Sequence, residues 1–203
     1  MLLSDRDILQ AMDEGSIEIN PFEREQLQSN GYDVRVDSTY YELKREVDAF
    51  FPFTEEFVEN AYEKKKARVK EVNVNGRKAR GKFIRLPSHG FILASTIERT
   101  KTIKDITASL RCRSSLARTA ISIARCAGWG DVGYGGVWTM EIVNHLKVPY
   151  YLPVGLRVGQ LVFFKTKTPP ENPYEGKYSG SREPALPRLY NDKDFEELIE
   201  IRE

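Results

Sequence analysis

The spacing of apolar positions changes several times along the chain. Ser4 followed three residues later by Asp7, and then the apolar residues Ile8, Leu9 and Met12, predict a short amphipathic helix that has an N-cap and stops near Gly15. After Asn30-Gly31, which supplies a tight turn, residues 32–36 alternate like a half-buried strand. The N-terminal region is therefore expected to pass from a helix into a sheet.

The stretch from about 45 to 82 has a different pattern. Phe50–Phe53 are apolar, Glu55–Lys66 fit a charged helix, and Glu71–Lys82 fit a hairpin that turns at Asn75-Gly76. We interpret this stretch as an insertion in a single domain that covers residues 1–203.

From Phe83 to Lys167 the chain shows short β-branched and aromatic runs separated by Gly, Pro and Asn. This spacing is typical of a β-sandwich or barrel. Residues 168–189 are rich in Pro, Gly, Ser and Tyr, and we expect a long irregular arm that serves as a lid or a linker to a neighbour. A closing helix is predicted from Asp192 to Ile201.

Composition favours one folded domain without a global charge. The 203 residues are 40% hydrophobic, and 31 Lys and Arg balance 30 Asp and Glu to a net charge of +1. The mean charge therefore gives no reason to expect nucleic acid or anionic lipid as a partner, and any anion site must be local. The Lys64–Lys66 run fits a local anion or RNA patch, but we favour a solvated helix face.

The apolar runs and the cysteines bear on where the protein is located and on the state of its thiols. No apolar run reaches the roughly 18 residues that span a bilayer, and charge interrupts the start MLLSDRDILQ, so we expect a cytoplasmic protein. The only cysteines, Cys112 and Cys126, lie in apolar, strand-like runs and are expected to be buried thiols.

The densest polar motif is Arg111–Arg118, where three guanidinium groups and two hydroxyls fall within eight residues. Arginine offers a fixed fork of donors to phosphate oxygens, and serine hydroxyls add neutral donors, so the segment suits a polyphosphate. The alternative is that Arg and Ser simply flank a turn.

The second motif is the glycine-rich stretch 127–136, followed by a strand over 137–144. Its glycines allow backbone to approach a ligand, while Asp131 and Tyr134 offer an acceptor for a hydroxyl and a ring for a sugar. It also fits a plain glycine-rich hairpin. Glu141, between Met140 and Ile142, is either exposed at a sheet edge or a buried carboxylate fit for general acid–base chemistry.

The known zinc-dependent route to cytosine deamination needs a His or Cys, a nearby Glu and a later Pro-Cys-x-x-Cys. This chain has only His89 and His145 and no such cysteine motif. Any such chemistry here would be zinc-free, with a carboxylate activating the water.

These motifs together resemble the dCTP deaminase family, in its archaeal-like form, which shares a fold with trimeric dUTPases. The matching stretches are MLLSDRDI (1–8), NGYDVR (30–35), RSSLAR (113–118), AGWGDVGYGG (127–136) with Glu141, and Pro173-Tyr174 with Gly176-Lys177-Tyr178. The resemblance implies a mainly β, distorted barrel of the jelly-roll-like dUTPase kind with a few short helices. It also implies a homotrimer in which segments 113–118 and 127–136 meet from different chains.

The resemblance assigns catalytic roles to matching positions. Ser114 and the backbone carbonyl of Ala127 would hold the attacking water. Glu141 would take the water proton and pass it to N3 of cytosine and to the departing ammonia, while Arg118 would hold Glu141 and a phosphate.

Substrate-binding roles follow in the same way. Asp131 would bind the 3′-hydroxyl, and Tyr134 would lie on the deoxyribose and disfavour a 2′-hydroxyl. The triphosphate, with Mg²⁺ bound through it, would be gripped by Arg113, Ser115, Tyr174 and Lys177. Regulation by dTTP is a further expectation.

The chain departs from the family pattern at Cys126, Gly130, Ser181 and Pro187, where Thr, Ile, Gln and Ser are common. The favoured reaction is deamination of dCTP to dUTP and ammonia. The alternatives are a bifunctional enzyme that releases dUMP and diphosphate, favoured by Ala127-Gly128-Trp129, a dUTPase that uses Asp131, and a non-catalytic nucleotide-binding trimer.

Overall fold

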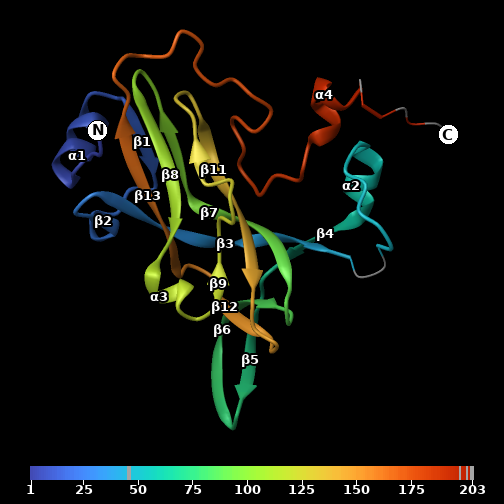
Figure 1. Ribbon diagram of the computed structural model, residues 1–203. Helices are drawn as coiled ribbons and strands as arrows, with labels where there is room; N and C mark the ends of the chain where they lie inside the picture. Colours follow the sequence, from blue (N-terminus) through green and yellow to red (C-terminus); the bar gives the residue numbers. More distant parts are fainter. Residues whose placement is uncertain (45–46, 197, 200, 202–203) are drawn as a thin grey trace.

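A computed structural model describes residues 1–44, 47–196, 198–199 and 201. Figure 1 shows a molecule built mainly of strands, so the mainly β prediction is confirmed. The helical segments are α1 (Asp5–Asp13), η1 (Arg24–Gln26), α2 (Glu55–Ala61), α3 (Ser114–Ala117), η2 (Leu189–Asn191) and α4 (Lys193–Glu196). The strands are β1 (Ile17–Asn20), β2 (Leu27–Gln28), β3 (Gly31–Leu43), β4 (Tyr62–Lys66), β5 (Val69–Val74), β6 (Arg77–Leu86), β7 (Phe91–Thr102), β8 (Ile106–Cys112), β9 (Ile121–Ser122), β10 (Trp129–Gly130), β11 (Gly135–Asn144), β12 (Tyr150–Pro153) and β13 (Arg157–Lys165).

The strands form a large curled sheet and a small one. The large sheet has the order β10-β8-β13-β3-β7-β11-β9, with β1 added to β7 and with β2 and β4 added to β3. The long strand β3 pairs with β13 through Tyr32–Arg35 and with β7 from Val36 onward, so it joins the two halves of the curl. The small sheet has the order β12-β6-β5.

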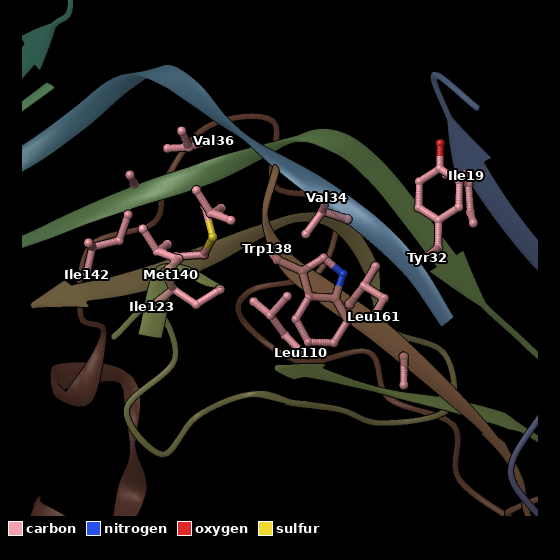
Figure 2. Close-up of a cluster of buried hydrophobic side chains, with 14 of the residues drawn as sticks. Ile19, Tyr32, Val34, Val36, Leu110, Ile123, Trp138, Met140, Ile142 and Leu161 are labelled. Atoms are coloured by element: carbon pink, nitrogen blue, oxygen red, sulfur yellow. The ribbon is translucent and has the colours of Figure 1, made fainter. Parts of the chain in front are cut away.

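The core lies inside this curl, as Figure 2 shows. Trp138, Met140 and Ile142 of β11 are buried there beside side chains from β3, β8 and β13. Successive side chains on a strand point to opposite faces. Thr139 and Glu141, which are half-buried, therefore face away from this core.

The N-terminal helix and the hairpin confirm two predictions made from local motifs. Ser4 caps α1 in a reciprocal capping box, because its hydroxyl accepts from the Asp7 N–H and the Asp7 side chain accepts from the Ser4 N–H. β5 and β6 turn at Asn75-Gly76, both of which have positive φ.

The predicted helix over Glu55–Lys66 is wrong in its second half. α2 ends at Ala61, and residues 62–66 form β4, which pairs antiparallel with β3. The Lys65 ammonium lies 2.8 Å from a Glu42 carboxylate oxygen on β3. The cations of this run therefore stand on a strand, not on a solvated helix face.

Two other expectations need correction. Cys126 is exposed, because it lies in the loop between β9 and β10, and Cys112 at the end of β8 is half-buried. The closing helix is shorter than the predicted Asp192–Ile201, with η2 before it and α4 ending at Glu196, and part of the predicted range lies outside the described residues.

No helix in the described part of the chain is long and apolar enough to cross a membrane.

Candidate active site

A cavity of about 410 Å³ opens on the face of β11 that points away from the core. Among its lining residues are these members of the predicted site: Ala127, Asp131, Tyr134, Glu141 and Tyr174. The glycine-rich stretch, the following strand and the C-terminal arm thus meet in one hollow.

Glu141 is held at this cavity by the register of β11. It lies opposite Leu93 of β7, and its carboxylate accepts a hydrogen bond of 3.2 Å from the backbone N–H of Arg125. Its side chain is half-buried, so neither edge exposure nor full burial describes it. A carboxylate that lines such a cavity is placed to act on a ligand bound in it.

Tyr134 supplies a neutral hydroxyl at the cavity wall. Burial, with a smaller contribution from Tyr174, raises the pKa of Tyr134 to about 12. Its hydroxyl donates a 2.9 Å hydrogen bond to the Val137 carbonyl, and its ring packs against Trp138 at 5.0 Å between centroids. The ring is therefore fixed at the cavity wall, as a surface for a sugar requires.

Asp131 is exposed and held by a neighbouring ring. The Trp129 indole N–H donates to its carboxylate at 3.1 Å, and the Trp129 ring stacks on Phe164. This arrangement keeps the other carboxylate oxygen of Asp131 open to a ligand hydroxyl.

Gly130 departs from the family pattern for a steric reason. A Cβ added at this position would lie 2.4 Å from the Trp138 ring. The indole fills the space of the missing side chain, and its N–H donates to the Thr100 hydroxyl at 2.8 Å. The large ring at 138 and the glycine at 130 thus form one packing unit.

The C-terminal arm follows the glycine-rich stretch closely. The Tyr174 N–H donates to the Val132 carbonyl at 2.7 Å, and the Val137 N–H donates to the Ser181 carbonyl at 2.9 Å. Gly136 has φ of 147°, and a Cβ there would lie 2.9 Å from the Ser181 backbone. Glycine is therefore required for this contact, and Ser181 contributes to it through its backbone.

Lys177 lies in the arm but does not line the cavity. Its ammonium donates to the Arg188 carbonyl at 3.0 Å and to the Asp192 carboxylate. In this conformation the arm binds its own lysine, which leaves Tyr174 as the arm residue of the predicted site that faces the cavity.

The Arg113–Arg118 segment forms a separate cluster at the end of β8. Ser114, Ser115 and Arg118 are exposed on and after α3 and do not line the cavity. Figure 1 shows α3 at the lower end of β8, away from the arm. Within one chain, Ser114, Ser115 and Arg118 therefore lie outside the cavity that Glu141 lines.

Asp33 positions Arg113 and was missed by the sequence analysis, which treated its segment as half-buried. The carboxylate is 2% exposed and lies 3.4 Å from both Arg113 Nε and Arg157 Nη1. A fully buried Asp needs such partners. A carboxylate in the NGYDVR motif was the available signal.

Several other cavity residues carried no signal in the sequence. Tyr62 of β4, Phe91 and Leu93 of β7 and Leu186 of the arm form an apolar wall. They are distant in the chain and belong to a second small core that includes α2. Among the described residues no group of three or more His, Cys, Asp or Glu could hold a metal ion.

Comparisons with known proteins place the chain in a family. A sequence model described as dCTP deaminase-like matches residues 2–166. A dUMP-forming dCTP deaminase of Sulfurihydrogenibium sp. (strain YO3AOP1) is 33% identical over 96% of this chain and 100% of its own length. A dCTP deaminase of Natronomonas pharaonis is also 33% identical, over 96% of this chain and 98% of its own.

A solved structure supports the fold. The 2′-deoxycytidine 5′-triphosphate deaminase from Agrobacterium tumefaciens matches with a TM-score of 0.57 and 18% identity over 81% of this chain. This chain spans about half the length of that protein, since the match covers 48% of it. The family model covers residues 2–166 and the two curated relatives each cover 96% of this chain, so it belongs to the dCTP deaminase-like family.

Proposed function

We propose that the protein deaminates dCTP by hydrolysis and so acts in pyrimidine deoxynucleotide metabolism in the cytoplasm. The observation that carries this proposal is the place of Glu141, half-buried on the cavity face of β11 beside Ala127, Asp131 and Tyr134. The names of the relatives, which include dCTP deaminases with and without the description dUMP-forming, support it.

In the proposed reaction, water adds to C4 of cytosine. Glu141 takes one proton from the water as its oxygen bonds to C4, and delivers that proton to N3. The proton of the new C4 hydroxyl then passes to the amine, the C4–N bond breaks to release ammonia, and the C4 carbonyl of uracil forms. A positioned group of this kind typically contributes about 100- to 10,000-fold in rate. Ser114 and the carbonyl of Ala127 hold the water, and Arg118 holds Glu141 and a phosphate.

Substrate recognition is divided between two surfaces in this proposal. Asp131 binds the 3′-hydroxyl and Tyr134 lies on the deoxyribose. The triphosphate enters with Mg²⁺, which neutralises its charge, and is bound by Arg113, Ser115, Tyr174 and Lys177. No zinc takes part, and dTTP is a candidate regulator.

We propose further that the active protein is a homotrimer with sites between chains. The support is geometric, because the exposed Ser114, Ser115 and Arg118 lie outside the cavity that Glu141 lines. A neighbouring chain that presents its α3 to this cavity would complete the site.

A product assay tests the reaction. The protein is incubated with dCTP or dUTP and Mg²⁺, and dUTP, dUMP, diphosphate and ammonia are resolved. Ammonia with dUTP supports a deaminase, and ammonia with dUMP and diphosphate supports the bifunctional alternative. Cleavage of dUTP alone, lost in Asp131→Asn, would identify a dUTPase, and no turnover of either nucleotide would leave only a nucleotide-binding trimer.

A further inference from the structure

The β5–β6 hairpin carries a strong positive charge, whereas the rest of the chain is negative. Residues 68–85 hold seven Lys and Arg against one Glu, so the segment carries +6 while the remaining chain carries −5. Figure 1 shows the hairpin projecting from the body at the end opposite the C-terminal arm. The near-neutral total therefore conceals a strongly basic projection, which the mean charge does not reveal.

The cations of this hairpin make few contacts within the fold. All of them are exposed, and the one ion pair that they form among the described residues is Lys78 with Glu71, whose nitrogen and oxygen are 3.7 Å apart. Lys70 lies over the Tyr151 ring at 5.5 Å from its centroid. By contrast, Lys64 and Lys65 on the neighbouring β4 each contact a carboxylate. Unpaired like charges on a narrow ribbon repel one another, so a bound polyanion would relieve that repulsion.

The strand register gives the hairpin two cationic faces. Lys78, Arg80 and Lys82 alternate along β6 on one face, about 6.7 Å apart at two residues per step. Arg77 lies on the other face near the turn, and Arg85 lies on that face at the base, where β6 pairs with β12. A two-stranded ribbon with cations on both faces matches a groove whose two walls both carry phosphates.

The chemistry of the hairpin favours duplex DNA over other nucleic acids. The major groove of B-DNA admits a two-stranded ribbon, whereas that of duplex RNA is too narrow. Single-strand binders need exposed aromatic rings for stacking. The rings near the hairpin, Phe83 and Tyr151, are half-buried and pack against each other at its base.

We propose that the β5–β6 hairpin binds the phosphate backbone of duplex DNA without sequence preference. The surface lies outside the candidate active site and does not depend on deamination. Its contacts are electrostatic, so the affinity depends steeply on salt.

The test is fluorescence anisotropy of a labelled duplex of about 20 base pairs, titrated with the protein from low to physiological salt. The variants are K78Q/R80Q/K82Q and a matched control, R6Q/K147Q/K167Q, which removes three exposed cations elsewhere. Each phosphate contact contributes about 0.9 to the slope of log K against log salt, so the hairpin variant should lose about 2.7. The control variant should keep the wild-type slope, as should the charge-preserving K78R/K82R.

Other outcomes would overturn the proposal. These are a wild-type protein that binds no duplex at low salt, a control variant that loses as much as the hairpin variant, and tighter binding to single strands or duplex RNA. A hairpin variant that changes the sedimentation coefficient but not DNA binding would instead identify a contact between copies of the chain. Deamination measured on the same variants should be unchanged.

Discussion

Glu141 is the residue on which the proposed chemistry depends. Replacing it with Gln keeps the shape and one hydrogen-bonding oxygen, so the contact with the Arg125 N–H should persist. The amide cannot accept a proton, so turnover of dCTP should fall about 100- to 10,000-fold while affinity changes little. Single-turnover kinetics and calorimetric titration of dCTP measure the two effects.

The control for this prediction is Glu175→Gln, which neutralises an exposed carboxylate of the arm that does not line the cavity. It should leave turnover unchanged. If Glu141→Gln deaminated dCTP at nearly the wild-type rate, the assignment of Glu141 as the acid–base group would fail.

Tyr134 gives a pH dependence of stability. Burial raises its pKa in the folded state to about 12, above the ordinary tyrosine value of 10.0 that applies when the chain is unfolded, so its hydroxyl ionises less readily in the folded state. The stabilising effect is complete below pH 10 and is lost as pH rises toward 12. When the pH rises from 9 to 11, this one group should lower the free energy of unfolding by about 1 kcal/mol.

Urea unfolding of wild type and Tyr134→Phe at pH 9 and pH 11 measures this effect. The variant loses the hydrogen bond to Val137, which costs about 1 kcal/mol at every pH. Its free energy of unfolding should therefore fall less between the two pH values than that of wild type. Equal losses in the two proteins would contradict a buried, neutral Tyr134.

At the level of elements, the arm depends on Gly136. Gly136→Ala would strain a residue with φ of 147° and place a methyl group against the Ser181 backbone. We expect the arm to detach, so trypsin should cut after Lys177 and Arg182 faster, and turnover should fall about ten- to a hundredfold.

Gly76→Ala is the matched control, because Gly76 also has positive φ but no atom within 4 Å of an added Cβ. It carries the backbone strain without touching the arm. The lid role is also tested by truncation after residue 170, which should abolish turnover while the rest of the chain stays folded. Normal turnover of the truncated protein would exclude a lid.

Elements with local signals could be predicted from the sequence, and elements made by distant pairing could not. The capping box of α1 and the Asn75-Gly76 turn are encoded within a few residues. β4 was missed because its Lys and Glu residues do not alternate with apolar ones, and its strand conformation comes from pairing with β3.

The site shows the same division. Glu141 was found because its apolar neighbours marked it out on a buried strand. Tyr62 and Leu93 reach the cavity only through the fold, so no sequence motif predicts that they line it. The buried carboxylate of Asp33 is paired with Arg113 and Arg157, which lie far along the chain. The spacing of residues in the sequence does not reveal that Asp33 is the partner of Arg113.

At the scale of the whole molecule, the proposed sharing of sites between chains predicts complementation between two inactive variants. Glu141→Gln and Arg118→Gln variants should each be inactive alone. In the proposed trimer, a mixture of the two variants would contain interfaces where an intact Glu141 of one chain meets an intact Arg118 of another, so activity should return on subunit exchange.

Turnover after mixing, unfolding and refolding the two variants together measures this recovery, and sedimentation confirms the trimer. Each variant refolded alone is the control. No recovery from trimers that contain both variants would place each site within one chain, and a fully active monomer would exclude a shared site altogether.

The packing of Gly130 against Trp138 restricts which substitutions these two positions can accept during evolution. Any side chain at 130 collides with the indole, and a smaller residue at 138 leaves a void and an unpartnered Thr100 hydroxyl. A single substitution at either position is therefore disfavoured. A double substitution that places a larger residue at 130 and a smaller one at 138 conserves the total volume. The two positions should covary among relatives, and a lineage that adopted this glycine and tryptophan pair cannot easily return by single steps.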